Sequence, residues 1–489
     1  MSAVYDQSTD PAYNEIYGSS ISMPAFESAS TSYRQEQRGA YLADADSLAI
    51  NELTLIQSRS RDAARNNPIA FAAESKFVTK LGAVKVNWKT KEGEKHELAQ
   101  ELWDEFAANP NKDGFGDLDV TQTLWNHDRF QSGEALSRLL LVTKNNPNRV
   151  KLKLQNIESE YLPISYMGTT MDEMGKTRYG ITFEEGIPTY YNFLPERYYG
   201  IQDANTINVN YVKVPAEDVL HIFERRRSNQ WRGIPVVAPL LNCLYELTDL
   251  TQATVSKQKS AAAISWIIEQ VNALDINAIG SVKTAGKQST NDPIQKMFFA
   301  ANGGSVQYTN PGDKFQLVQS SDIGNNLMGL IKHELQTIAA AYGIPYYMLS
   351  GDTSGLDFSS IRGILIEFRD FLEYIHHVIN IPSGLAKVTA RFKDVARFSF
   401  AVEDAYPTYQ MPRNYGVDEL KDAQADLLEL QLGATTLERI QQERGVTMEE
   451  VLASRAKMKT NDLGEILQAT PPSAGQNANV KANNNSTGS

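Results

Sequence analysis

The sequence predicts an α+β protein that is mainly helical. Two long amphipathic helices flank a loop at residues 343–358, because apolar residues recur at three- and four-residue steps on both sides of it. Short β-rich runs lie between residues 139 and 215, and near the C-terminus glycines and threonines divide the chain into short helices. With 489 residues the chain exceeds the length at which one core keeps growing, so we expect two or more packing units.

Composition narrows the classes of function. A net charge of -12 argues against tight binding of nucleic acid, because neutralising phosphates requires clustered Lys and Arg. An acidic wall would suit a channel along which DNA slides, but plain solubility explains the same charge and ranks first on charge alone. The single cysteine, Cys243, stands among leucines and excludes an internal disulfide, so we expect a buried thiol and an intracellular protein. No apolar run of membrane-spanning length and no secretion signal are present, so we expect neither a membrane span nor export.

The N-terminal half is expected to join helices to a mixed sheet. Residues 1–47 lack periodicity and predict a flexible arm, and helices follow around Leu53, from Ala70 towards Gly82, and over 98–106 and 120–130. The alternating runs from 139 to 215 fit a sheet, with a hairpin turn at 184–186.

The middle of the chain is expected to form two helices joined by an irregular excursion. Gly233-Ile234-Pro235 breaks the chain, and a long helix starts near Pro239 and becomes Ala-rich at 261–263, where small residues let helices approach closely. Helical periodicity fails over 272–322, and Gly303-Gly304 favours a small β-containing segment. The second helix spans about 323–342.

The loop after this helix has clear boundaries. Gly343 is expected to end the helix in the left-handed conformation, Pro345 forbids its continuation, and Ser359 or Ser360 would cap the next helix. Asp352 and Asp357 are the charged residues of the loop, which therefore should not hold a phosphate backbone.

The C-terminal part is expected to hold strands and then short helices. After the helix that follows the loop, the alternation of 388–404 predicts strands. A helix over 418–432 should stop at Gly433, and two further helices should begin at capping boxes, Thr435 with Glu438 and Thr447 with Glu450. Residues 469–489 are of low complexity and are expected to be disordered.

Patterns that suggest catalysis or metal binding fail on inspection. The segment 280–288 resembles a phosphate-binding loop but has five residues between its glycines and Gln at the magnesium-ligand position. Asp113, Asp117 and Asp119 imitate part of a calcium loop without its final Glu, and a turn explains them better. We therefore expect no catalytic residues, no cofactor and no metal. One basic cluster, at 225–232 with Trp231, could contact nucleic acid by stacking.

Three segments together resemble a known family. GIPYYMLSGDTSGLDFSSIR (343–362) and HIFERRRSNQWRGIPVVAPLLNCLYELTDLTQATVSKQKSAAA (221–263) look like the two best-marked blocks of lambda-like bacteriophage portal proteins, and 412–458 is similar to that family's C-terminal pattern. The resemblance implies a portal fold assembled as a ring. Its parts would be a flexible N-terminal arm (1–47), a wing (48–232, with a helix and strands at 359–415), two stem helices (233–271 and 323–342), a clip (272–322), a tunnel loop (343–358), a crown (416–468) and a disordered tail (469–489).

The function implied by the resemblance is structural. About a dozen copies, a dodecamer, would form a ring at a unique capsid vertex, through which double-stranded DNA is packaged and ejected. The ring would be a virion component assembled in the host cytoplasm, and it would contact the terminase large subunit, tail or adaptor proteins and the major capsid protein. The tunnel-loop residues would be Ser350, Asp352, Thr353, Ser354 and Asp357, the motor-facing clip residues Lys283, Lys287 and Lys296, and the subunit contacts Arg225, Arg226, Arg227 and Arg232.

Other interpretations remain open. The clip lysines are explained as well by ordinary solvated side chains. A DNA-processing enzyme, either a nuclease or an NTPase, would use the basic cluster as its DNA contact, but it requires an acidic metal cluster or a phosphate-binding loop. A non-portal head-tail adaptor ring is a third possibility, which the helix-loop-helix order disfavours.

Overall fold

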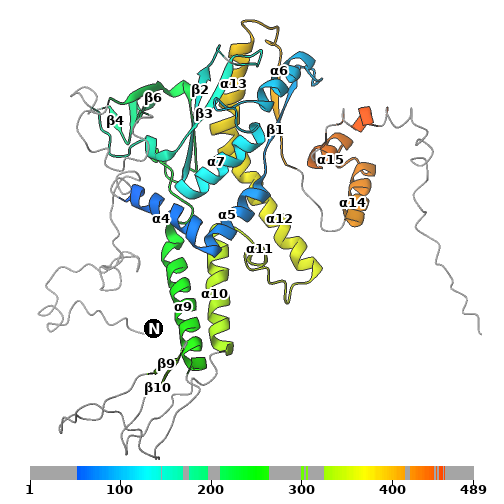
Figure 1. The fold of residues 1–489 in the computed structure, drawn as a ribbon. Coiled ribbons are helices and arrows are strands. Elements are labelled where there is room, and N and C mark those ends of the chain that lie inside the picture. The colour runs from blue at the N-terminus through cyan, green and yellow to red at the C-terminus, as the bar shows by residue number, and fades with distance from the viewer. Residues whose placement is uncertain are drawn as a thin grey trace, which may run out of the picture.

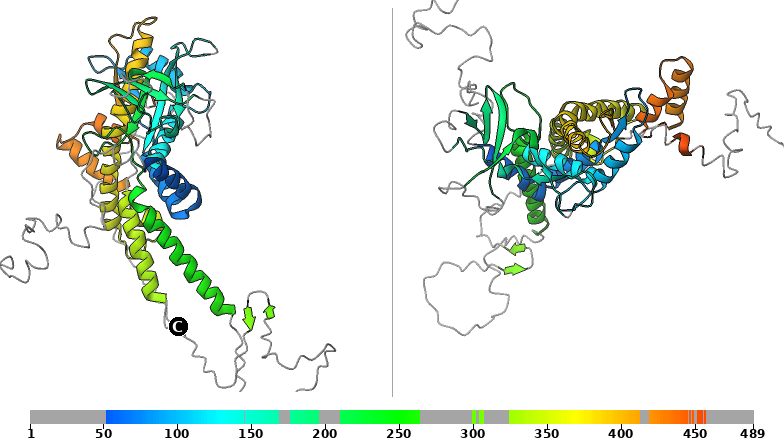
Figure 2. Two further views of the ribbon diagram at one scale, coloured as in Figure 1. Left: turned by 90° about the vertical axis from the view of Figure 1, so that its left-hand side faces the viewer. Right: turned by 90° about the horizontal axis from the view of Figure 1, so that it is seen from above.

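The structure is a body of helices and sheets from which two long helices extend side by side (Figures 1 and 2). This computed structural model describes residues 52–144, 146–168, 176–195, 210–263, 299–301, 304–306, 324–412, 419–444, 446, 448, 451–454 and 456. The expected N-terminal arm, the expected tail and most of the expected clip lie outside the described residues. The described part is a mixture of helices and strands, in agreement with the α+β prediction.

Four helices open the described chain. They are α4 (Leu53–Asn66), α5 (Pro68–Leu81), α6 (Glu97–Ala108) and α7 (Leu118–Ser132). Asn67 separates the first two, and its side-chain oxygen accepts hydrogen bonds from the backbone N–H groups of Ile69 and Ala70 at 3.0 and 3.2 Å. Asp117 caps α7 in the same way by accepting from the Val120 N–H, so the aspartates of 113–119 belong to a turn and a helix cap.

Two antiparallel sheets and one ribbon make up most of the β structure. The first sheet has the order β3-β2-β8, from Leu152–Ile157, Glu134–Leu141 and Val219–Phe223. The second has the order β4-β5-β6-β7, from Thr177–Arg178, Ile181–Glu184, Ile187–Phe193 and Val212–Pro215. The ribbon pairs β1 (Lys85–Lys89) with β11 (Tyr406–Gln410), so it joins segments more than three hundred residues apart in sequence. Short 3-10 turns, η3 (Ser159–Tyr161) and η5 (Ala216–Asp218), accompany the sheets.

The two extending helices are α9 (Leu241–Ala263), preceded by η6 (Ala238–Leu240), and α10 (Gly324–Tyr342). We keep the name stem helices for α9 and α10, which lie within the predicted ranges 233–271 and 323–342. The assignment of a portal stem stays a prediction. A hairpin of β9 (Phe299–Ala301) and β10 (Gly304–Val306) lies in the excursion between them, as Gly303-Gly304 indicated.

A long helical rod follows the loop and crosses the body. It consists of α12 (Phe358–Ile375), a π-helical stretch η8 (His376–Leu385) and α13 (Ala386–Ala396). The prediction of strands over 388–404 is therefore wrong. Val388, Phe392 and Ala396 recur at four-residue steps and are buried, so the helical period outweighs the local alternation.

The core places Phe392 of α13 among aromatic side chains of the N-terminal part. Its ring centroid lies 5.0 Å from that of Trp103, 5.6 Å from that of Trp88 and 5.6 Å from that of Phe106. All four side chains are buried, so the rod, the ribbon and α6 share one hydrophobic core.

Beyond β11, the chain forms α14 (Glu419–Gln431) and α15 (Leu437–Glu443). Gly433 follows α14 as predicted, but the hydroxyl that bonds the first turn of α15 is that of Thr436, one residue later than expected.

The free edge of β1 is closed by side-chain amides. Gln122 accepts from the Val84 N–H and donates to the Val84 carbonyl, both at 3.0 Å. Gln100 accepts from the Trp88 N–H at 2.9 Å, and the His96 N–H donates to the Trp88 carbonyl at 2.8 Å. The backbone groups that a further strand would pair with are thus already occupied.

A buried ion pair ties the body to the start of the stem. Glu134, the first residue of β2, is fully enclosed and accepts from Arg232 Nε at 3.0 Å, from the Gly233 N–H at 2.9 Å and from His221 Nε2 at 3.0 Å. The Arg232 guanidinium also donates to the Tyr179 carbonyl at 3.2 Å, which links the second sheet to the pair. The segment 221–233 and the start of β2, far apart in sequence, therefore meet at one carboxylate.

Ionisation of this cluster follows from its contacts. Burial alone would raise the pKa of Glu134, but the charge of Arg232 and the hydrogen bonds from His221 and Arg232 outweigh it and lower the pKa to about 2. Burial lowers the pKa of His221 despite its bond to Glu134. Both lowered pKa values are consistent with an ionised Glu134 and a neutral His221. The imidazole then donates from Nε2 to Glu134 and accepts at Nδ1 from the Tyr191 hydroxyl, 3.3 Å away.

Two glycines bring the backbone into direct contact beside the pair. A Cβ on Gly233 would lie 2.1 Å from the Gly133 carbonyl oxygen, and one on Gly133 would lie 2.3 Å from the Ile234 carbonyl carbon. Gly133 also adopts a φ of 85°, which L side chains rarely take. The start of the stem is therefore fixed against the end of α7 with no room for a side chain.

We expect Glu134→Gln to lower the free energy of unfolding by about 3–5 kcal/mol, because it leaves the Arg232 charge buried without its partner. Chemical denaturation at neutral pH measures this change. Glu92→Gln, at an exposed turn, is the matched control and should change stability little. A loss below about 1 kcal/mol would show that the buried charge is compensated elsewhere.

Acid titration gives the same prediction a second readout. The folded pKa of Glu134 lies below its ordinary value of 4.5, so its ionisation stabilises the fold above pH 4.5, and this contribution disappears as pH falls towards 2. Glu134→Gln should show a shallower loss of stability across this interval than the unaltered chain.

Candidate functional site

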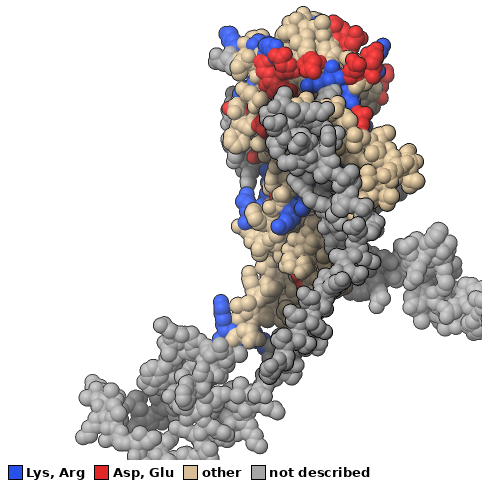
Figure 3. All heavy atoms as spheres, turned by 90° about the vertical axis from the view of Figure 1, so that its right-hand side faces the viewer, with Lys and Arg blue, Asp and Glu red and all other residues tan. Residues whose placement is uncertain are grey.

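The two stem helices change from buried to exposed along their length. Next to the body, Leu244 and Leu247 of α9 and Ile338 and Tyr342 of α10 are buried. Farther out, apolar side chains face outward, and Met328 is 66% exposed. In Figure 3, charged side chains of both signs gather at the upper end of the molecule, and below it the visible described surface is mainly uncharged with a few Lys or Arg side chains. Such a surface on a single chain is typical of a contact face.

Gly343 ends α10 in the predicted left-handed conformation, with a φ of 70°. A Cβ at this position would lie 2.6 Å from a ring carbon of Phe371 in α12, so glycine is needed for close approach as well as for the turn. The segment that follows is partly helical, because α11 (Tyr346–Ser350) begins after Pro345 and ends at Gly351, which has a φ of 73°. The loop between α10 and α12 is thus a compact, ordered turn.

Asp352 organises the centre of this loop. Its carboxylate accepts a hydrogen bond from the Ser354 N–H at 2.9 Å and a short one from the Ser354 hydroxyl. Lys332 of α10 lies 3.4 Å away, which ties the loop back to the stem. The bonds from Ser354 and then the charge of Lys332 lower the pKa of Asp352 to about 2, so the loop carries this negative charge at neutral pH.

Asp357 caps the next helix. Its carboxylate accepts from the Ser360 N–H at 2.7 Å, and the bonds from Ser360 lower its pKa. The expectation that Ser359 or Ser360 would cap α12 is therefore wrong. A carboxylate at the N-cap also interacts favourably with the helix dipole, which a hydroxyl does less strongly.

The predicted tunnel-loop residues lie together in this turn. Ser350, Thr353, Ser354 and Asp357 are exposed, and Asp352 is half-buried. The Ser350 hydroxyl accepts from the Asp352 N–H at 3.1 Å, so part of the polar surface is used to hold the turn. Lys332 was not predictable from the sequence, because its contact with Asp352 spans twenty residues and depends on how the loop folds back.

The basic cluster divides into exposed and buried members. Arg225 lies over the ring of Trp231 with 4.1 Å between guanidinium and centroid, and the Arg226 side chain is 70% exposed and 2.9 Å from Glu224. Arg232 is buried in the ion pair with Glu134, so the prediction of a subunit contact is wrong for its side chain. For Arg225, Arg226 and Arg227, the subunit contact stays a prediction.

The clip residues Lys283, Lys287 and Lys296, and the segment 280–288, lie outside the described residues.

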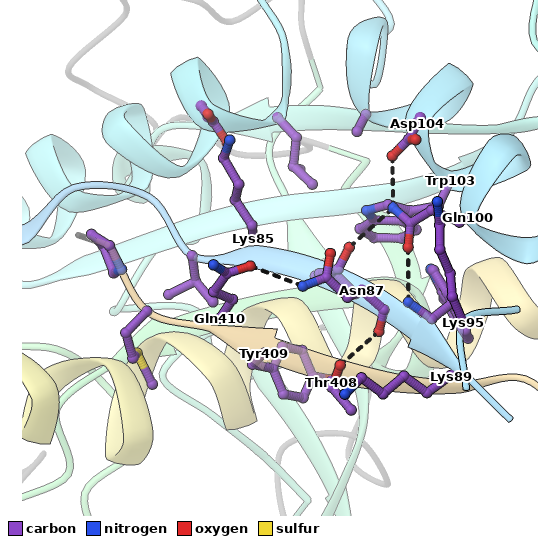
Figure 4. Close-up of a pocket in the computed structure, with 18 of the residues that line it drawn as sticks. Lys85, Asn87, Lys89, Lys95, Gln100, Trp103, Asp104, Thr408, Tyr409 and Gln410 are labelled. Atoms are coloured by element: carbon purple, nitrogen blue, oxygen red, sulfur yellow. Dashed lines mark hydrogen bonds between the residues drawn. The ribbon is translucent and has the colours of Figure 1, made fainter. Parts of the chain in front are cut away.

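A groove of about 1350 Å³ runs along the β1–β11 ribbon, between α6 and α15 (Figure 4). Asn87 and Gln410 join across the ribbon at 2.9 Å, and the Thr408 hydroxyl donates to the Asn87 carbonyl at 3.0 Å. Charged groups in the groove pair with one another, as Lys89 does with Glu438 at 3.1 Å. These contacts join the β1–β11 ribbon to α15.

Within the described ranges, no three His, Cys, Asp or Glu side chains are grouped so as to hold a metal ion. The adjacent histidines His376 and His377 do not form a metal-binding pair. His376 is buried, with its Nε2 2.9 Å from the Leu81 carbonyl oxygen, whereas His377 is exposed. None of the described helices combines the length and the apolar character needed to cross a membrane.

The comparison with protein families decides the identity of the chain. The family described as "Phage portal protein, lambda family" matches residues 31–376, which include the basic cluster, both stem helices, the loop and α12. The chain belongs to the lambda family of phage portal proteins. The resemblance of 412–458 lies outside the matched residues, so the assignment of a crown remains a prediction.

Individual portal proteins are distant relatives of this chain. The probable portal protein of Halomonas phage phiHAP-1 is 25% identical over 253 residues, which cover 52% of this chain and 47% of that protein. Portal protein B of Escherichia phage lambda is 23% identical over 271 residues, which cover 49% of each. The chain thus spans about half the length of these relatives. Among solved structures, a chain in the neck of an empty gene transfer agent particle has 13% identity and a TM-score of 0.39, over 85% of this chain and 98% of that one.

We expect Asp352→Asn to accelerate amide hydrogen exchange in 351–356 by about tenfold, because it weakens the bonds that the carboxylate accepts from Ser354 and the pairing with Lys332. Hydrogen exchange with mass spectrometry measures it. Glu403→Gln, exposed and distant in sequence, is the control. Unchanged protection in 351–356 would mean that the carboxylate does not hold the turn.

Proposed function

We propose that this protein forms the portal ring at a unique capsid vertex, through which double-stranded DNA enters and leaves the particle. The observation that carries the proposal is the family match over residues 31–376. The match includes the two stem helices and the loop between α10 and α12, which are the parts assigned to the channel. The ring acts by assembly rather than by catalysis, and it is a component of the virion that is assembled in the host cytoplasm.

The loop supplies the narrow part of the channel in this proposal. Ser350, Thr353, Ser354 and Asp357 present exposed polar groups, and Asp352 and Asp357 keep negative charge because their pKa values are lowered. A ring of such loops repels phosphates and leaves no strong binding positions along the path. DNA then slides without being held.

The remaining surfaces receive partners and neighbours. The exposed apolar side chains of α9 and α10 pack against the same helices of adjacent copies, in a ring of about a dozen subunits. The end of the stem, with Lys283, Lys287 and Lys296, faces the terminase large subunit during packaging and tail or adaptor proteins later. The wing contacts the major capsid protein.

We expect negative-stain images of the purified full chain to show rings with an axial hole. Apolar faces that are exposed in one subunit favour such closed assembly. ATPase and nuclease assays on the same sample distinguish a portal from a DNA-processing enzyme. Monomers at micromolar concentration, or metal-dependent DNA cleavage, would contradict the proposal.

We expect Thr353→Lys to make the ring retain duplex DNA at low salt, because one added cation per subunit would face the phosphates. Each neutralised phosphate strengthens binding and steepens its salt dependence. Co-sedimentation of rings with a linear duplex at 50 and 200 mM salt measures retention. Thr353→Gln controls for side-chain size. If the lysine variant binds no more DNA than the glutamine variant, the loop does not face the channel.

A further inference from the structure

One face of α12 is exposed although the opposite face is packed into the body. We call Gly363, Ile366, Glu367, Asp370 and Tyr374 the α12 face, because their spacing places them on one side of the helix. Ile366 is 51% exposed and Tyr374 is 47% exposed, whereas Phe368 and Ile375 on the other side are buried. Within the described part of the chain, Glu367 and Asp370 take part in no ion pair. The face therefore combines uncovered apolar area with two negative charges.

At its N-terminal end, this face has room for close approach. A Cβ on Gly363 would meet no atom within 4 Å, so nothing in the subunit requires a glycine there. Glycine in the interior of a helix weakens it. A glycine at such a position fits a helix surface against which something else packs.

A second surface of this protein has the complementary character. We call residues 224–231 the basic loop, which carries Arg225, Arg226 and Arg227 against one acid, Glu224. The loop is rigid. Buried Gln230 accepts from the Arg226 N–H at 2.9 Å and donates to the Arg232 carbonyl at 2.8 Å, and Arg225 Nε donates to the Gln230 carbonyl at 2.8 Å. A preorganised loop loses little entropy when it binds.

The basic loop and the α12 face lie on opposite sides of the subunit. Trp231 of the loop packs edge-on against Phe183 of β5, with ring centroids 4.9 Å apart. Figures 1 and 2 show the sheet that contains β5 on one side of the body and α12 on the other. In a closed ring each subunit presents one side to its neighbour's other side, so the two sides have to be complementary.

We propose that in the ring the basic loop of each copy docks on the α12 face of the next copy. This inference rests on the proposed portal ring, and it names the surfaces that meet. Arg226 and Arg227 approach Glu367 and Asp370, the Arg225–Trp231 stack covers Ile366 and Tyr374, and Gly363 lets the loop approach closely at the N-terminal end of the face. Opposite charges fix the register of the contact, and the aromatic and aliphatic groups exclude water from it.

The test exchanges the charges in the full-length chain. We expect Arg226→Glu with Arg227→Glu, and separately Glu367→Lys with Asp370→Lys, to raise the concentration at half assembly by about tenfold or more, because like charges then face each other. Combining all four substitutions should restore assembly. Mass photometry measures the ring fraction, and circular dichroism confirms folding. The control is Lys91→Glu with Lys144→Glu, two exposed lysines of the body, which should leave assembly unchanged.

A steric pair of variants provides an independent readout. Gly363→Leu should raise the thermal stability of the monomer yet reduce ring formation, whereas Gly363→Ala should raise stability and keep the ring. Unaltered assembly in both charge-reversed chains, failure of the fourfold variant to recover, or rings with Gly363→Leu at full yield would overturn the contact while leaving the portal assignment intact. A wild-type chain that forms no rings would overturn both.

Discussion

The carboxylate of Glu134 is the point on which the arrangement of body and stem depends. It receives Arg232, His221 and the Gly233 backbone in a site closed to solvent, so β2, β8 and the segment that leads into α9 hold one relative position. A buried charge without partners is unfavourable by several kcal/mol, so all these segments have to be in place together. The contact of Gly133 with Gly233 adds a steric limit to the same junction. Because this segment leads into α9, the cluster fixes the place at which the chain leaves the body towards that helix.

The long rod of α12, η8 and α13 crosses the body and contacts its other helices along the way. Its first part packs against Phe77 of α5 through Phe371, with ring centroids 6.4 Å apart, and its last part places Phe392 in the aromatic core. The π-helical stretch between them contains His376, which bonds to the end of α5, and Asn380, which donates to Asn126 of α7 at 3.0 Å. Both parts of the rod are thus held by polar contacts at the place where the helical geometry changes.

Local patterns in the sequence were enough to predict the two long helices α9 and α10, the role of Gly343 and β structure in the excursion, because periodicity and backbone conformation are properties of neighbouring residues. The strands expected over 388–404 were wrong because the segment also carries the four-residue spacing of Val388, Phe392 and Ala396, and only the shape of the core decides between the two periods. The burial of Arg232 was not predictable either. Its partner Glu134 lies almost one hundred residues away, and the arginine stands in a segment that otherwise looks like a surface cluster. The caps at Asp357 and Thr436 differ from expectation only by a choice among adjacent polar residues.

The side-chain amides of Gln100 and Gln122 affect how identical copies of the chain behave at high local concentration. An open strand would offer the same row of backbone donors and acceptors to every molecule it met, and chains at high local density would join by whatever edge came first. By occupying the backbone of Val84 and Trp88 from within, the two glutamines remove that indiscriminate route to aggregation at the edge formed by β1. Recognition between molecules is then left to the shape and charge of side chains, which can tell a correct neighbour from an accidental one.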